Sequence, residues 1–192
     1  MWSVRRYLRE LQKTPLPNPD VPGPLNASGL SYVCHGNFFA ENGAGPFNSY
    51  TEMATWFDRR RFSVQVLRHA EESKLLDCPK FDASLPLVLC HMDLHVQNLI
   101  VDKNGRLWTI DWENGGALPP CLEYAEMVIS GSQSVCEAAC APKLWTWCTQ
   151  FRVGDYCKYK TGYLDKLRWA FERPAGEYFP LDYFDKLGLK VD

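Results

Sequence analysis

The sequence lacks any long apolar run. No segment approaches the roughly 20 apolar residues that a membrane-spanning helix requires. The opening stretch, MWSVRRYLRELQK, carries charge throughout, whereas a signal peptide needs an uncharged apolar centre. These absences predict a soluble, cytoplasmic protein with no membrane partner.

A strong charge of one sign is also missing. The chain has 21 basic and 23 acidic residues and a formal net charge of -2. This balance excludes the basic field by which proteins hold nucleic acid, so we predict no nucleic-acid partner. The adjacent arginines at 59–61 could still form a local basic patch. We favour the solvated C-terminal end of a helix, where positive side chains are common.

Paired metal-binding cysteines are absent as well. The chain has eight cysteines but no C-x-x-C pair. Cys136 and Cys140 stand four residues apart and lack the second pair that a structural zinc site would need. We therefore favour reduced, buried thiols over a zinc site or a disulfide framework.

The remaining composition is that of a globular protein. Hydrophobic residues make up 46% and charged residues 23% of the 192 residues, which suits one domain with a hydrophobic core. We expect one α+β domain over 1–192 that is mostly α. The predicted helices are 2–13, 49–61, 63–76, 119–130, 133–151, 157–171 and 181–187.

The first quarter of the chain contains clear signals for where helices begin and end. In residues 2–13, apolar side chains recur at helical spacing. Five prolines between residues 15 and 24 then predict an extended connector, because proline lacks the amide donor that a helix needs. Ser49-x-x-Glu52 is a capping-box pattern that begins the next helix.

A hairpin is the strongest local signal in the chain. The turn sequence Asp102-Lys103-Asn104-Gly105 separates two strand-like segments, 98–101 and 106–110. Asn and Gly tolerate the positive φ angles that such turns require. The hairpin would return Asp111 to the base of the polar loop that precedes its first strand.

That loop and the end of the hairpin carry the chemistry. Residues 91–98 read HMDLHVQN, and residues 109–113 read TIDWE. Phosphoryl transfer needs a carboxylate that orients the attacking hydroxyl and accepts its proton, and oxygen ligands for Mg²⁺. Asp93 suits the first role, and the oxygens of Asn98 and Asp111 suit a hard cation. Taken alone, Asp93 could be a turn residue and Asp111 a strand terminator, but the apolar approach to Asp111 predicts a partly buried, functional carboxylate.

HMDLHVQN followed by TIDWE resembles the catalytic loop and metal-binding segment of the aminoglycoside phosphotransferase family, which is related to protein kinases. The resemblance implies a kinase-like C-terminal lobe that uses ATP and Mg²⁺ to phosphorylate a hydroxyl of a small-molecule acceptor. It implies that Asp93 is the general base and that His91 supports the loop. It also implies that Asn98 and Asp111 bind Mg²⁺ and, through it, ATP. Fainter likeness at GPF (45–47) and PPCLEY (119–124) looks like the fungal branch of the family.

The sequence departs from the family pattern before His91. It has no glycine-rich phosphate loop and no strand lysine of the V-A-I-K type there, so we expect a C-terminal lobe without the N-terminal β-lobe and with incomplete ATP binding. We divide it into an N-terminal helix with its proline connector (1–25), the catalytic and metal-binding segment (85–113) and a helical subdomain (119–192). We expect the face that would meet an N-terminal lobe, here called the upper face, to be exposed, apolar and capable of self-association.

Several alternatives stay open. Glu113 could contact metal or substrate, although we favour a solvent-facing neighbour, and for His95 we favour packing within the loop. Trp145, Trp147 and Trp169 could be core residues or could line an acceptor pocket. A non-catalytic binding module and, less favoured, a metal-dependent hydrolase compete with the phosphotransferase hypothesis. The sequence does not identify the acceptor.

Overall fold

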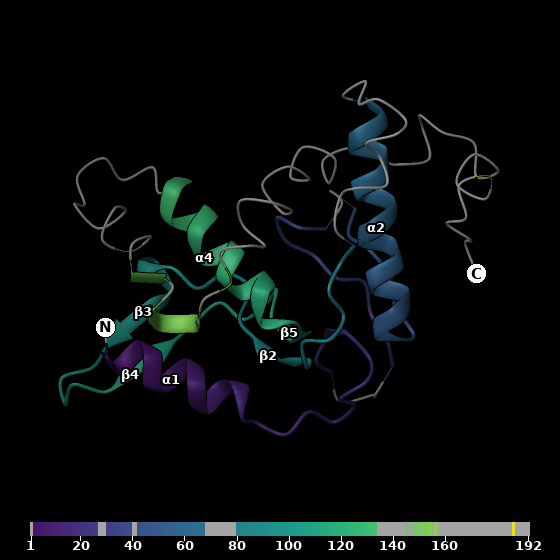
Figure 1. The fold of residues 1–192 in the computed structure, drawn as a ribbon. Coiled ribbons are helices and arrows are strands. Elements are labelled where there is room, and N and C mark those ends of the chain that lie inside the picture. Colours follow the sequence, from purple (N-terminus) through teal and green to yellow (C-terminus); the bar gives the residue numbers. More distant parts are fainter. Residues whose placement is uncertain are drawn as a thin grey trace.

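The computed structural model of the chain describes residues 2–26, 30–39, 42–67, 80–133, 145, 148, 149, 151–154, 156 and 186. The elements in order are α1 (Trp2–Gln12), β1 (Gly23–Pro24), α2 (Tyr50–Leu67), β2 (Val88–Cys90), the 3-10 helix η1 (Val96–Asn98), β3 (Leu99–Val101), β4 (Leu107–Thr109), β5 (Gly116–Leu118) and α4 (Pro120–Gln133). The fold is α+β, as expected, with helices and two small antiparallel sheets. Figure 1 shows α2 at one end of the described part and the β3–β4 hairpin, beside α1, at the other.

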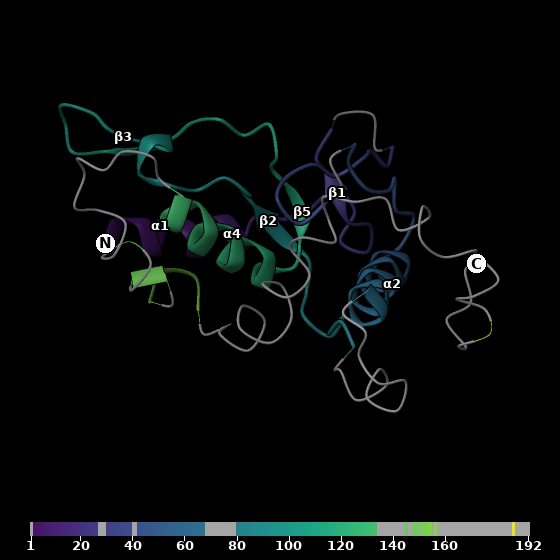
Figure 2. The ribbon, with the colours of Figure 1, turned by 90° about the horizontal axis from the view of Figure 1, so that it is seen from above.

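The central sheet joins three distant segments in the order β1-β5-β2, with antiparallel pairing throughout. Figure 2 shows these strands between α2 and the α1–α4 pair. Gly116 pairs with both Cys90 and Pro24. A Cβ atom at Gly116 would lie 2.5 Å from the carbonyl oxygen of Gly23, so this crossing requires glycine. Because β2 ends at Cys90, the sheet fixes the point from which the HMDLHVQN loop departs.

The predicted N-terminal helix is confirmed as α1. Val4 and Leu8 are buried on one side of it, and the hydroxyl groups of Tyr7 and Thr109 lie 2.6 Å apart in a hydrogen bond. Helix α1 therefore packs its apolar side inward and is tied to strand β4.

The capping pattern at the start of α2 is confirmed in one half and shifted in the other. The Ser49 hydroxyl accepts a hydrogen bond from the Glu52 amide at 3.1 Å. The Glu52 carboxylate accepts from the Asn48 amide at 2.7 Å, one residue earlier than the pattern predicts. The first contact satisfies an amide that the helix leaves without a partner at its start, and the second ties the residue before the cap to the first turn.

The prediction that this helix ends near Arg61 is wrong, because α2 continues through Ser63 to Leu67. The adjacent arginines are also not a solvated helix end: Arg60 and Arg61 are buried. The Arg60 guanidinium lies over the Trp56 ring at 5.0 Å, and Arg61 Nε lies 3.7 Å from the Asp58 carboxylate. These contacts stabilise the two buried guanidinium groups on the surface of α2 that packs against the rest of the protein. The second predicted helix, 63–76, is therefore part of α2 as far as Leu67, and residues 68–76 lie outside the described ranges.

The helix predicted to open at the Pro119-Pro120 pair is confirmed as α4, which runs three residues beyond the expected end at Ser130. Proline suits the first turn because its missing amide hydrogen has no partner there in any case. The helices predicted at 157–171 and 181–187 lie almost wholly outside the described residues. Of the 133–151 segment after α4, the described residues are Trp145, Cys148, Thr149 and Phe151, and they are helical.

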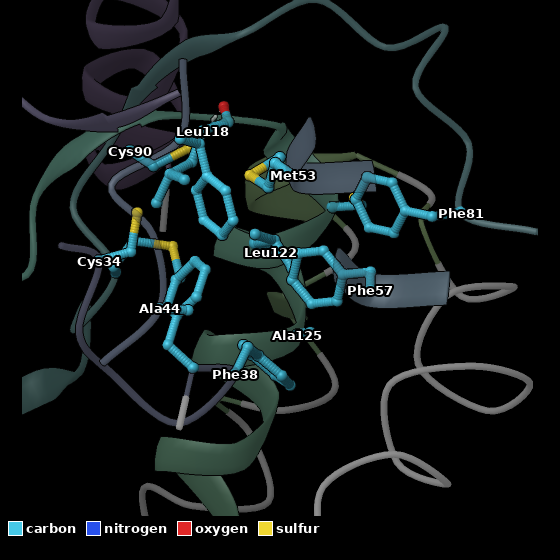
Figure 3. Close-up of a cluster of buried hydrophobic side chains, with 14 of the residues drawn as sticks. Cys34, Phe38, Ala44, Met53, Phe57, Phe81, Cys90, Leu118, Leu122 and Ala125 are labelled. Carbon is cyan, nitrogen blue, oxygen red and sulfur yellow. Dashed lines mark hydrogen bonds between the residues drawn. The ribbon is translucent and has the colours of Figure 1, made fainter. Parts of the chain in front are cut away.

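Two hydrophobic clusters make up the described core. The larger one joins α2, β2, β5 and α4 (Figure 3). In it, the Phe57 and Phe81 rings stack with centroids 4.6 Å apart. The smaller cluster consists of Val4, Leu8, Leu94, Met127 and Trp145. Met92 belongs to the larger cluster and Leu94 to the smaller one, so each residue next to Asp93 is anchored in a different core.

The described cysteines are free and buried: Cys34, Cys90, Cys121 and Cys148. Burial raises the pKa of Cys34 to about 12, so its thiol stays protonated. The prediction of reduced, buried thiols is thus confirmed for these four. Within the described ranges, no group of three His, Cys, Asp or Glu side chains could hold a metal ion, and no helix has the length and apolar composition needed to cross a membrane. Cys136 and Cys140 fall outside these ranges.

Candidate active site

One buried carboxylate, that of Glu123, fixes the start of the loop that follows β2. Oε2 of Glu123, in the first turn of α4, accepts hydrogen bonds from the amides of His91 at 2.6 Å and Met92 at 3.1 Å. Met92 has a φ of 62°, a left-handed conformation that non-glycine residues adopt only at a cost in energy. Glu123 therefore stabilises a strained turn immediately before Asp93.

His91 joins this loop to the far end of the hairpin. Its ring is fully buried, with Nε2 2.9 Å from the carbonyl oxygen of Ile110 and Nδ1 accepting from the Asp93 amide at 3.3 Å. Because Nδ1 is an acceptor, the proton of the neutral ring lies on Nε2. Burial lowers the pKa of His91, while the Ile110 carbonyl and the charges of Asp93 and Asp111 oppose that shift. A buried neutral ring with both nitrogens engaged suits a structural link better than a proton shuttle.

Asn98 fixes the position of Asp93. Its side-chain amide nitrogen donates to the Asp93 carbonyl oxygen at 2.8 Å and to the Asp93 carboxylate at 3.0 Å. Both amide hydrogens are thereby used, which leaves Oδ1 of Asn98 as the atom available for a cation. Asn98 is buried, whereas Asp93 keeps about a third of its side chain exposed (29%). The aspartate is thus rigidly held and accessible.

The hairpin returns Asp111 to this loop as the sequence predicts. Strands β3 and β4 pair from Leu99–Thr109 to Val101–Leu107, and the Ile110 amide donates to the carbonyl oxygen of Asn98 at 3.1 Å. Ile110 thus contacts both Asn98 and His91 through its backbone, and Asp111 comes next. The expectation that Asp111 is partly buried is wrong, because its side chain is exposed. The apolar residues before it face solvent in part, so they do not enclose the carboxylate.

Asp111 also has an unusual backbone. Its φ is 66°, in the left-handed region that costs most non-glycine residues about 1–2 kcal/mol. The two hydrogen bonds of the preceding Ile110 hold the chain in place around it. Strain of this kind persists where the surroundings impose it, and it is common at functional sites.

Sequence reasoning missed Glu123. The side chain is 1% exposed. Burial raises its pKa to about 7, although the hydrogen bonds from the two backbone amides act to lower it. Its second oxygen, Oε1, is buried and makes no hydrogen bond to any described residue. A glutamate inside the otherwise apolar helix start PPCLEY was the available signal, but its partners lie more than 30 residues earlier in the chain.

His95 does more than pack within the loop. Its Nδ1 accepts from the Gln97 amide at 3.2 Å and so caps η1. Its Nε2 lies 3.5 Å from Oδ1 of Asp93. The packing interpretation is therefore incomplete, because His95 lies against the predicted base. Glu113, in contrast, is exposed, in keeping with a solvent-facing neighbour.

A cavity of the described part lies away from this site. It measures about 590 Å³ and is lined by residues 43–47 and the first turns of α2. None of its lining residues belongs to the 91–111 segment. Trp145 does not line it either: it is buried and donates to the Met127 carbonyl at 3.1 Å, as a core residue does. Trp147 and Trp169 lie outside the described residues.

Comparison with protein-family models decides the family. The model of the phosphotransferase enzyme family (APH) matches residues 6–174. The chain belongs to this family. The match spans part of α1 and all of the candidate loop, the hairpin and α4, so the phosphotransferase family assignment covers every part of the site described above. Searches of curated proteins and of solved structures found no match.

Proposed function

We propose that this phosphotransferase-family chain transfers a phosphoryl group from ATP to a hydroxyl of a small-molecule acceptor, with Asp93 as the general base. The observation that carries the proposal is the way Asp93 is held. Met92 and Leu94 anchor it in two cores, Asn98 bonds its carboxylate, and part of the side chain stays open to solvent. A general base in phosphoryl transfer must be a carboxylate that is held in place and that the acceptor hydroxyl can reach.

In this reaction the Asp93 carboxylate accepts a hydrogen bond from the acceptor hydroxyl and so orients its oxygen toward the γ-phosphorus. The hydroxyl proton passes to Asp93 as the new O–P bond forms, and ADP leaves with the electrons of the broken P–O bond. General-base assistance of this kind contributes about 10²- to 10⁴-fold to a rate. His91 and Glu123 contribute by holding the loop.

The donor atoms fit the Mg²⁺ that the family uses. Oδ1 of Asn98 and the carboxylate of Asp111 are hard oxygen ligands of the type that Mg²⁺ prefers. Asn98 is fixed by its two bonds to Asp93, and Asp111 is presented on the strained turn after β4. Both would hold the ion, which when bound neutralises charge on the ATP phosphates. This assignment gives Asn98 two functions, one through each end of its amide.

The isosteric change Asp93→Asn tests the base assignment. We expect ADP release from MgATP, measured with an aminoglycoside, choline, an amino alcohol and a sugar as acceptors, to fall at least 10²-fold. The melting temperature should stay within a few degrees, because the amide keeps the size of the side chain. Asp20→Asn, on the exposed connector, is the matched control. Full turnover by Asp93→Asn would remove Asp93 from the base role.

A non-catalytic, kinase-like binding module is the second candidate. It is favoured by the segment before His91, whose described residues form α1, β1, α2 and β2 and include neither a glycine-rich phosphate loop nor a strand lysine. Turnover that depends on both Mg²⁺ and Asp93 would reject this candidate.

The hairpin and the residues next to it also expose apolar side chains beside the candidate site: Val96, Ile100, Val101, Trp108 and Ile110. We propose that they belong to the upper face of a C-terminal lobe. Self-association through this face stays a prediction.

A further inference from the structure

The two carboxylate oxygens of Asp93 have different neighbours. Oδ2 accepts from Asn98 at 3.0 Å. Oδ1 lies 3.5 Å from Nε2 of His95, which is longer than an ordinary N–H···O hydrogen bond. Catalytic hydrogen bonds are often long in the absence of substrate and shorten when it binds. The geometry thus brings a second nitrogen to the oxygen that Asn98 does not bond.

The tautomer of His95 is set by the other side of its ring. Nδ1 accepts a hydrogen bond from the Gln97 amide at 3.2 Å, so the proton of the neutral ring is on Nε2. The His95 backbone is extended, with φ -137° and ψ 177°, and its carbonyl accepts from the Asn98 amide at 3.1 Å. Cap and backbone together fix the ring whose Nε2, which carries the hydrogen, lies 3.5 Å from Oδ1 of Asp93.

We propose that His95 is a positioning residue that donates its Nε2 hydrogen to Oδ1 of Asp93 and fixes the orientation of the carboxylate during transfer. This inference rests on the proposed function. With Oδ2 held by Asn98 and Oδ1 held by His95, the Asp93 carboxylate cannot rotate about its Cβ–Cγ bond. One set of lone pairs then faces the acceptor hydroxyl.

His95 does not accept the hydroxyl proton in this scheme, because its Nε2 already carries a hydrogen. The proton leaves the acceptor oxygen and stays on Asp93 until the product departs. His95 therefore affects the rate through the geometry of the base, and misplacement of a catalytic group by about 1 Å can cost 10²-fold. The loop then uses its two histidines differently: His91 bonds the backbone from inside the core, and His95 bonds the base from the solvent side.

Two substitutions separate this function from capping. In His95→Asn the side-chain oxygen matches Nδ1 and can keep the cap on Gln97, but no donor reaches Asp93. In His95→Gln the amide nitrogen matches Nε2 and can reach Asp93, but the cap is lost. We expect His95→Asn to lower kcat roughly 10- to 100-fold with unchanged KM for MgATP and an unchanged melting temperature. We expect His95→Gln to keep kcat within a few-fold and to melt at a lower temperature, because a cap is worth about 1 kcal/mol.

Wild-type kcat in His95→Asn, or an equal loss of kcat in both variants, would overturn the proposal and reduce His95 to a cap. A second measurement needs no turnover. The ¹⁵N signals of the His95 ring should show the hydrogen on Nε2, and the Nε2 signal should move in Asp93→Ala. If that signal does not move, the contact is absent and the proposal fails. If it moves while wild-type protein shows no Asp93-dependent turnover, the proposed phosphotransferase function fails and the contact stands.

Discussion

Glu123 makes stability depend on pH in a way that a single substitution can reveal. Its pKa rises from 4.5 in an exposed glutamate to about 7, chiefly through burial. Between these two values the folded chain holds a proton that the unfolded chain has released. The resulting stabilisation is complete below pH 4.5 and is lost as the pH rises through 7.

The size of the effect follows from the shift. One pKa unit corresponds to about 1.4 kcal/mol, so the window from pH 5 to pH 8 contains about 2–3 kcal/mol of pH-dependent stability. Glu123→Gln keeps an oxygen that can accept from the His91 and Met92 amides, but it does not titrate. We expect the free energy of unfolding of the variant, relative to wild type, to rise by this amount across the window. A constant penalty for the buried amide group would move the curve without changing its slope.

Urea denaturation at pH 5, 6, 7 and 8, at constant ionic strength, measures this difference. Glu113→Gln is the control, because its carboxylate is exposed and should give a much smaller change. Parallel curves for wild type and Glu123→Gln would refute the reasoning. They would mean that the two amide donors at 2.6 and 3.1 Å keep Glu123 ionised in spite of its burial.

Two further predictions concern the backbone and the anchors of the site. Asp111→Gly should be more stable to urea than Asp111→Ala by about 1 kcal/mol, because glycine adopts the observed φ of 66° without strain; equal stabilities would show that the turn stores no strain. Leu94→Ala should cost about 2–5 kcal/mol in urea denaturation, because the side chain is fully buried. The half-exposed Ile100 is its control, and a similar cost for Ile100→Ala would contradict the anchoring of the loop by the core.

The parts of the site that sequence predicts are those encoded locally. The turn Asp102–Gly105 and its two flanking strands determine the position of Asp111. Oδ1 of Asp102 accepts hydrogen bonds from the amides of Asn104 at 2.8 Å and Arg106 at 2.9 Å, and these bonds fix the turn. Likewise, α1 and α4 follow from apolar spacing and from a proline pair. In each case the residues that decide the structure are neighbours in the chain.

The parts that sequence misses depend on contacts between distant residues. Three adjacent arginines resemble a helix end, but Trp56, Asp58 and the surrounding core accommodate two of them within α2. Glu123 contacts the loop because α4 packs next to β2 in the folded chain. Asp111 was expected to be partly buried because of its apolar neighbours, yet a two-stranded hairpin leaves them half exposed. Periodicity and spacing carry none of this information.

The most direct test of the central claim is where the chain binds a divalent cation. Mn²⁺ can replace Mg²⁺ as a paramagnetic probe, and it broadens the NMR signals of nearby amides. We expect broadening centred on Asp93, Asn98 and Asp111 that excess Mg²⁺ reverses, that Asp111→Ala abolishes and that Glu113→Gln leaves in place. Broadening that lies elsewhere, or that persists in Asp111→Ala, would contradict the assignment of these residues to one metal-binding site.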